Sequence, residues 1–108
     1  MVHFDGEAAL RALADPRRRR MLELVWDRER SSSDLARSCR LSPPAASQHL
    51  KVLREADLVS VRSEGNRRFY RLRADRLAEL RAMLDQFWGG RLARLQSELT
   101  VSERETRQ

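Results

Sequence analysis

The sequence contains very little cysteine and no long apolar segment. Its one cysteine, Cys39, excludes an internal disulfide and a zinc site built from several cysteines of one chain. No apolar run approaches the roughly 20 residues that span a membrane, and the N-terminus does not show the pattern of a secretory signal peptide. We therefore expect a cytoplasmic protein that does not interact with membranes.

Lysine is equally scarce. Lys51 is the one lysine among 22 Lys and Arg residues, and all the others are arginines. Against 16 Asp and Glu residues they give a net charge of +6. This charge fits an anionic partner such as DNA, RNA or an acidic membrane surface, although a high arginine content can also reflect genomic base composition. The positions of the arginines along the chain must therefore decide between these two explanations of the charge. With 108 residues, of which 41% are hydrophobic, the chain suffices for one domain with one modest core.

Short helices are expected in the first half of the chain. The first covers residues 4–14, and the second follows Asp15, whose side chain suits a helix N-cap. Four consecutive arginines, residues 17–20, then lie near a helix N-terminus, where positive charge is unfavourable. A DNA phosphate nearby would offset this unfavourable charge, and we take Arg18 as the candidate contact. Solvation, or pairing with Asp15 and Glu23, is the alternative.

The run SPPAASQHLK opens a further helix, which we expect over residues 42–57, after a short helix that ends near Cys39. Ser42 suits an N-cap, and two prolines are tolerated in a first turn whose N–H groups have no partner within the helix. His49 falls on the apolar stripe of this helix. We expect it to be a core histidine with a hydrogen-bonded ring nitrogen.

After residue 57 the pattern changes to an alternation of apolar and polar residues, which predicts a β-hairpin with a turn around Gly65 and Asn66. Its tip and return strand carry a cluster of arginines: Arg62, Arg67, Arg68, Arg71 and Arg73. Two short helices joined by a tight turn and followed by a basic hairpin make a winged helix-turn-helix. The predicted fold is mainly α with a small β-hairpin wing.

This arrangement predicts binding to double-stranded DNA, whose major groove is about 12 Å wide and admits one helix. Small residues at the helix start would let its backbone approach the bases, and Gln48 can pair with adenine. The candidate contacts on the helix are Ser42, Pro44, Ala45, Ser47, Gln48, Lys51 and Arg54, and those on the wing are Arg67 and Arg68. The alternative is that Ser47 and Gln48 are ordinary surface residues.

A long amphipathic helix is expected over residues 75–99. Its stripe is more apolar than a small core can absorb, so we expect a second copy of the chain to cover it. Gly89 and Gly90 interrupt the stripe at a cost of about 1 kcal/mol each, which predicts a kink or a split there. The expected organisation is one domain over residues 1–99 and a flexible tail over residues 100–108. The stripe includes Leu80, Leu84, Phe87, Trp88, Leu92 and Leu95.

Three segments closely resemble the ArsR family of bacterial winged-helix repressors: ALADPRRRRMLELV, the run from SSSDLARSCRL to RRFYRL, and FWGGRLARL. The resemblance extends from about Ala9 to Leu95, and SPPAASQHLKVLREADLV is its most specific part. It implies a homodimer joined through the first and last helices, in which Phe4 and Leu10 would contribute from the first. It also implies repression through imperfect palindromes, with autoregulation as an option. The DNA contacts that it implies are Ser42, Ala45, Ser47, Gln48, Lys51, Arg67 and Arg68.

The sequence departs from the family at its usual metal sites. Many members carry a Cys-x-Cys pair on the helix before the recognition helix, where this chain has SDLARSC with Cys39 alone. Others carry histidine and carboxylate ligands on the last helix, which here contains no histidine. We therefore predict no metal ion and no other cofactor. A site between subunits that uses His3, Cys39 or His49 is the alternative, and Cys39 is expected to be a small core residue rather than a redox switch.

No constellation of residues favours catalysis. Ser47 and His49 lie two positions apart and so point to different faces of a helix, and no glycine-rich phosphate loop or carboxylate pair occurs. We predict a sequence-specific repressor rather than an enzyme. Two alternatives stay open: a repressor that responds to a thiol reaction or to a small hydrophobic molecule near Phe87 and Trp88, and a protein-interaction module that has lost DNA binding. The operator, the regulated genes and any inducer cannot be identified from the sequence.

Overall fold

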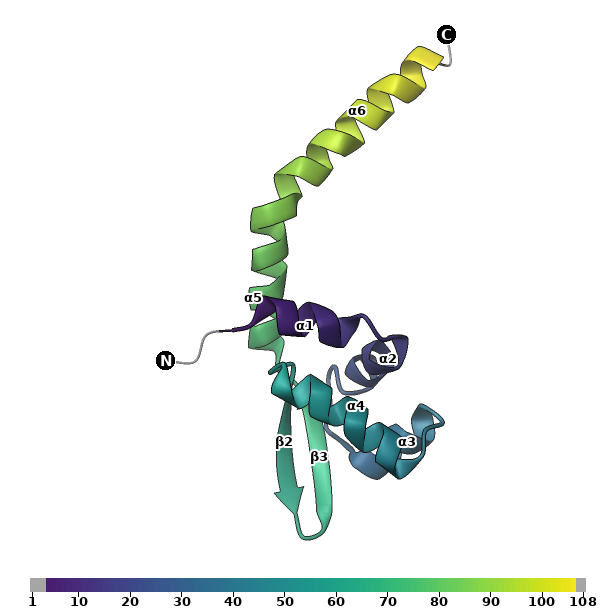
Figure 1. The fold of residues 1–108 in the computed structure, drawn as a ribbon, viewed down its shortest axis with the longest axis vertical. Helices are drawn as coiled ribbons and strands as arrows, with labels where there is room; N and C mark the ends of the chain where they lie inside the picture. The colour runs from purple at the N-terminus through teal and green to yellow at the C-terminus, as the bar shows by residue number, and fades with distance from the viewer. Residues whose placement is uncertain (1–3, 107–108) are drawn as a thin grey trace.

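A small helical body, a two-stranded wing and a long projecting helix make up the fold (Figure 1). The structure is a computed structural model that describes residues 4–106, with side chains up to residue 101. Its elements in chain order are α1 (Gly6–Leu13), α2 (Pro16–Leu24), β1 (Arg30–Ser31), α3 (Ser32–Ser38), α4 (Pro43–Glu55), β2 (Val59–Glu64), β3 (Arg67–Leu72), α5 (Ala74–Leu84), the π-helical turn η1 (Asp85–Gly89) and α6 (Gly90–Thr106). The predicted winged helix-turn-helix is confirmed.

Side-chain caps explain where the first helices begin. Asp5, Asp15, Ser31 and Ser42 each accept a hydrogen bond from a backbone N–H group in the first turn of α1, α2, α3 and α4. Such caps satisfy donors that would otherwise lack a partner in the helix. The predicted caps at Asp15 and Ser42 are therefore confirmed.

The sheet has three antiparallel strands in the order β1–β3–β2. The wing strands β2 and β3 pair up to Glu64 opposite Arg67, which leaves Gly65 and Asn66 as a two-residue turn. Gly65 has a φ of +60°, a conformation that residues with a side chain rarely adopt. The two-residue strand β1 was not predicted from the sequence; it pairs with Phe69 and Tyr70 in the middle of β3 and joins the wing to the body.

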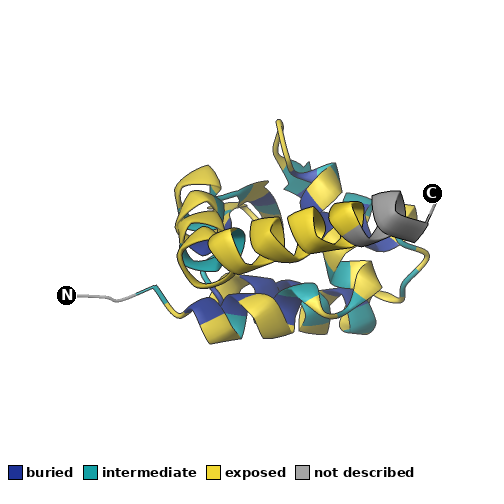
Figure 2. Ribbon diagram, turned by 90° about the horizontal axis from the view of Figure 1, so that it is seen from above, coloured by how far each residue is buried: buried dark blue, intermediate teal, exposed yellow. Residues whose placement is uncertain are grey.

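The core lies between the helices of the body and the base of the wing (Figure 2). Its largest fully buried side chains come from α2, α3, α4 and the segment before β2: Met21, Val25, Leu35, Leu50, Leu53 and Leu58. Leu80 of α5 belongs to the same core and is 3% exposed. Its assignment to the dimer interface was therefore wrong, because the body of its own chain already covers it.

The last helix is divided where the sequence predicted an interruption. The π-helical turn Asp85–Gly89 separates α5, which packs on the body, from α6, which leaves the body and extends to Thr106 (Figure 1). Residues 100–106 thus continue the helix, in contrast to the flexible tail expected from residue 100. No proline or glycine follows Gly90 to end the helix. Within the residues described, no helix is long and apolar enough to cross a membrane.

Candidate nucleic-acid interface

Helix α4 presents a polar face to solvent while its opposite face closes the core. Ala46, Leu50 and Leu53 are buried, and Ala45 and His49 are partly buried. The candidate contacts Ser42, Pro44, Ser47, Gln48, Lys51 and Arg54 are all exposed. Lys51 lies 4.0 Å from Glu55 in a solvent-exposed ion pair, which holds it only weakly. The contacts of these residues with DNA remain predictions.

The pleat of the wing separates its two candidate arginines. Successive side chains in a strand point to opposite faces, so Arg68 shares a face with Tyr70, whereas Arg67 shares the other face with Phe69. Tyr70 is buried against the body, which places Arg68 on the side of the wing that faces α4. Arg67 lies at the tip of the outer face, with its guanidinium carbon 5.3 Å from the centre of the Phe69 ring.

A groove runs between α4 and the wing. It consists of two adjoining hollows that share Ser47 of α4 with Arg68 and Tyr70 of β3, and we call it the helix–wing groove. The first hollow has a volume of about 830 Å³ and is further lined by Ser32, Ser33, Ala36, Arg37, Leu41 and Pro43. The second is further lined by Pro44, Gln48, Lys51 and Arg54. Six of the predicted DNA contacts thus line this groove, and α3 forms one of its walls.

The sequence analysis missed the α3 wall of this groove. Ser33 and Arg37 are one helical turn apart and both are exposed, so they project from the same side of α3. This spacing was visible in the sequence, but the position of α3 beside the wing was not. The Arg37 guanidinium lies 2.7 Å from the Asp34 carboxylate in an exposed pair.

Arg18 is directed into the body and away from this groove. Its Nε and Nη2 atoms donate to the carbonyl oxygens of Ala12 and Arg11 at 2.6 and 3.1 Å. Its Nη1 atom lies 3.3 Å from His49 Nδ1 and 3.8 Å from an Asp15 carboxylate oxygen, and 16% of the side chain is exposed. Arg18 is therefore engaged within its own chain, and its predicted phosphate contact stays a prediction. The partner expected for a ring nitrogen of His49 is present, and it is this arginine.

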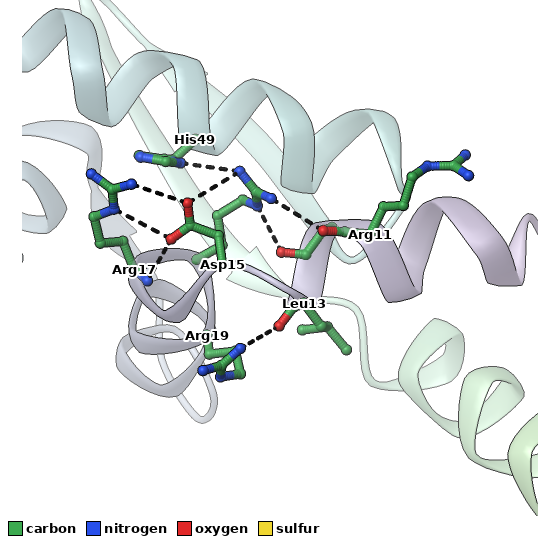
Figure 3. A network of polar contacts seen from close by, with 8 residues as sticks. Arg11, Leu13, Asp15, Arg17, Arg19 and His49 are labelled. Atoms are coloured by element: carbon green, nitrogen blue, oxygen red, sulfur yellow. Dashed lines mark hydrogen bonds and ion pairs between the residues drawn. The ribbon is translucent and has the colours of Figure 1, made fainter.

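The neighbouring arginines are also engaged within the chain, and Figure 3 shows the contacts of Arg17 and Arg19. Arg17 pairs with Asp15 at 3.2 Å, Arg20 pairs with Glu23 at 3.2 Å, and Arg19 donates to the carbonyl oxygen of Leu13 at 2.7 Å. The last carbonyls of α1 form the negative end of its dipole. They accept hydrogen bonds from Arg18 and Arg19, which offsets the unfavourable position of these two arginines at the start of α2.

Electrostatic contacts shift several pKa values around these elements. A side-chain hydrogen bond and a backbone hydrogen bond from Arg17 lower the pKa of Asp15 from 3.8 to about 2. On the outer face of the wing, the hydrogen bond from Arg62 lowers the pKa of Glu29, and Arg62 also pairs with Glu64 at 2.8 Å. Arg62 is therefore committed to its own chain.

Cys39 and His49 do not assemble with other metal ligands among the described residues. Cys39 is partly buried at the end of α3, and burial raises the pKa of its thiol, which disfavours the reactive thiolate. Within residues 4–101, no three side chains of His, Cys, Asp or Glu form a group that could hold a metal ion. His3, which the sequence analysis considered as a ligand, lies outside the described residues.

A second exposed surface lies on α6 and the turn before it. Phe87, Trp88, Leu92 and Leu95 are between 54% and 64% exposed, and Leu99 continues the patch one turn further along α6. Large exposed apolar patches of this kind mark interaction sites. Of the other predicted interface residues, Leu10 is 41% exposed, whereas Phe4 and Leu84 are partly buried against the core of their own chain. The turn itself forms a hollow lined by Gln86, Phe87, Gly90, Arg91 and Arg94.

Comparisons with known sequences identify similar regulators. Residues 15–61 match the family described as "Bacterial regulatory protein, arsR family". The HTH-type transcriptional regulator Rv2034 of Mycobacterium tuberculosis is 46% identical over 82 residues, which cover 76% of this chain and 77% of that protein. The arsenical resistance operon repressor of Staphylococcus xylosus is 34% identical over 85 residues, which cover 79% of this chain and 82% of the repressor.

Solved structures give the same result. A possible transcriptional regulator for arsenical resistance matches with a TM-score of 0.72 and 44% identity, over 82% of this chain and 93% of the other. The homodimeric winged helix-turn-helix DNA-binding domain of Mb0332 from Mycobacterium bovis, a possible ArsR-family regulator, matches with a TM-score of 0.63 and 32% identity over 73% of both chains. The likeness to both structures includes the sequence as well as the fold.

Proposed function

Because the chain belongs to the ArsR family of bacterial regulatory proteins, we propose that it is a repressor that binds specific DNA sequences as a homodimer. The family consists of DNA-binding transcriptional regulators rather than enzymes. A relative that is named as an operon repressor supports repression rather than activation.

The helix–wing groove is the observation that carries this proposal. It joins the exposed face of α4 to the arginine-bearing side of the wing on one surface of the molecule. We propose that α4 enters the major groove and that Ser47 and Gln48 read base edges there, with Ala45 close to a thymine methyl group. Ser42, Pro44, Lys51, Arg54, Arg67 and Arg68 would position the chain on phosphates and in the adjacent minor groove.

The proposed homodimer is supported by the exposed apolar patch on α6 and by the homodimeric relative. In the dimer we expect Phe87, Trp88, Leu92 and Leu95 to be covered, together with Leu10 from α1. Each α4 would then enter one of two successive major grooves, about 34 Å apart. An operator for such a dimer is an imperfect palindrome, and repression of the chain's own gene would be a natural use of it.

We further propose that this regulator works without the family's usual metal sites, which the sequences of α3 and the last helix do not provide. A response to a small hydrophobic molecule is a second candidate. The hollow at the π-helical turn is its candidate site, because Phe87 offers an apolar surface there. Quenching of tryptophan emission by candidate molecules would test this candidate.

The first test is a titration of the protein against the DNA upstream of its own gene and against a scrambled duplex, by fluorescence anisotropy at several salt concentrations. A repressor of its own gene should bind the upstream DNA tightly and the scrambled duplex weakly, with a steep dependence on salt. Equal binding to both would place the operator elsewhere. A failure to bind either duplex at low salt would overturn the proposal and favour a protein-interaction module.

Two substitutions separate base reading from phosphate binding. Gln48→Ala should relax the preference at one base position by roughly 1–3 kcal/mol, because it removes a base contact. Arg67→Ala should weaken binding to all sequences alike and reduce the salt dependence by about one counterion. A uniform loss of affinity for every sequence in Gln48→Ala would show that this side chain does not read a base.

A further inference from the structure

Tyr70, the chain's one tyrosine, lies in the middle of β3 on the face of the wing that meets the body. Its neighbours across the sheet are Val61 of β2 and Arg30 of β1, and the residue is 5% exposed. The ring is therefore held between two strands and the core, so the direction of its hydroxyl is fixed by the fold.

The Tyr70 hydroxyl opens toward the helix–wing groove. Tyr70 lines both hollows of that groove, beside Ser47 and Arg68. Among the described side chains, Arg76 Nε is the one buried polar atom that lacks a hydrogen-bond partner, so the tyrosine hydroxyl is not sealed inside the core. The hydroxyl also makes none of the hydrogen bonds between the described residues. It is a positioned donor without a partner in its own chain.

The geometry of DNA determines which group would lie over this hydroxyl. A sugar–phosphate strand separates the major groove from the minor groove. If α4 enters the major groove and the tip of the wing reaches the adjacent minor groove, this strand must pass through the helix–wing groove that lies between them. The base edges of the two grooves then lie on either side of Tyr70, and the DNA group nearest to its hydroxyl is a backbone phosphate.

We propose that the Tyr70 hydroxyl donates a hydrogen bond to one phosphate of the strand between the two grooves. This inference rests on the proposed function and adds a DNA ligand that does not belong to the recognition helix or to the wing tip. The Tyr70 hydroxyl is neutral, so its contribution differs from that of Arg68. It adds affinity and fixes the position of the DNA backbone relative to the protein, but it releases no counterion. A rigid ring also loses little side-chain freedom on binding.

The test uses Tyr70→Phe, which keeps the buried ring and removes the hydroxyl alone. The DNA probes are a duplex that the wild-type chain selects from a random-sequence pool and an unselected duplex from the same pool. We expect Tyr70→Phe to bind both duplexes roughly tenfold more weakly, with the salt dependence unchanged. Its thermal midpoint should equal that of the wild type, because the hydroxyl has no partner in the free protein. Arg68→Gln should reduce the salt dependence by about one counterion.

Ser60→Ala is the matched control, since it removes a hydroxyl from the outer face of the same hairpin. Ser60 is exposed, and its hydroxyl donates to the carbonyl oxygen of Arg71 at 3.5 Å. We expect this variant to bind DNA as the wild type does. A loss of affinity equal to that of Tyr70→Phe would assign the effect to the stability of the wing and overturn the proposal.

Neutral methylphosphonates placed one at a time in the selected duplex provide a second readout. At one backbone position the substitution should weaken the wild type but leave Tyr70→Phe unaffected, as expected of a direct pair. Unchanged affinity in Tyr70→Phe, or additive effects at every position, would overturn the phosphate contact. If the wild type enriches no sequence from the pool, the proposed sequence-specific function fails instead. The comparison of Tyr70→Phe with the wild type on unselected DNA still stands in that case.

Discussion

Asp15 connects α2 with α4 through one carboxylate and the side chain of Arg18. It caps α2 through the Arg17 N–H at 2.8 Å, pairs with the Arg17 guanidinium, and lies 3.8 Å from Arg18, which in turn contacts His49 of α4. These contacts favour the charged form, and the pKa of Asp15 falls from 3.8 to about 2. Since the carboxylate is charged more readily in the folded state than in the unfolded state, it stabilises the fold only while it is ionised.

The pH dependence of stability follows from this shift. The stabilisation by Asp15 is complete above its unfolded pKa of 3.8 and is lost as the pH falls through about 2. Asp15→Asn keeps the cap but cannot ionise. The difference in unfolding free energy between the two proteins, measured by urea titration, should therefore be constant above the unfolded pKa and should shrink below it. If the unfolding free energies of the two proteins instead change with pH in parallel below the unfolded pKa, the stabilisation is not due to the ionised Asp15.

Single residues were predictable where local geometry decides their environment. The exposure of Ser47 and Gln48 follows from the spacing of the buried residues on one helix, and the caps follow from residue type. Arg18 and Tyr70 were not predictable in this way. The partners of Arg18 are carbonyls at the end of another helix and a histidine 31 positions away, and the groove beside Tyr70 exists only after α3, α4 and β3 assemble.

The wing depends as an element on its two-residue turn. Gly65 adopts a φ of +60°, and no atom lies within 4 Å of the place where a Cβ atom would be. Gly65→Ala should therefore lower the free energy of unfolding by about 1 kcal/mol through backbone strain alone. Urea titration followed by circular dichroism would measure this change.

Gly90→Ala is the matched control for that substitution. Gly90 has a φ of −65° at the junction with α6, and no atom lies within 4 Å of its Cβ position either. The same chemical change should there raise the stability by about 1 kcal/mol, because alanine favours a helix. Effects of equal sign at the two positions would refute the role assigned to the turn of the wing.

The helices and the wing hairpin were predicted from their sequence patterns, whereas the two-residue strand β1 was not. The alternation over residues 58–72 carries enough positions to define a hairpin, whereas β1 has two residues and exists because β3 lies beside it. The glycine pair did indicate where the last helix changes. It did not reveal that the change is a π-helical turn, since such a turn depends on how α5 is held by the body.

The whole molecule is longer than a domain of its size requires, with principal extents of 66 × 37 × 21 Å. The projecting helix α6 contributes to this length, and its large apolar side chains are exposed (Figure 1). A glutamate in this patch should prevent a second copy from covering it, because burial of an unpaired charge is strongly unfavourable. Since one half-site binds more weakly than two linked half-sites, DNA affinity should fall as well.

Leu92→Glu tests this expectation, and Ser97→Glu adds the same charge at an exposed position on the opposite side of the same helix. Sedimentation velocity should show a dimer for the wild type and for Ser97→Glu, and a monomer for Leu92→Glu. If Leu92→Glu remains a dimer with full DNA affinity, the patch on α6 is not the subunit interface.

The π-helical turn also sets the angular phase of α6. Successive residues of an α-helix are about 100° apart, and a π turn holds roughly one residue more than an α turn. The leucines of the last helix keep one helical spacing in the sequence, yet the turn rotates the later ones by about a quarter of a revolution: Leu77, Leu80 and Leu84 before it, and Leu92, Leu95 and Leu99 after it. The geometry of this turn, as much as the leucines themselves, thus determines in which direction the chain offers a surface to its partner.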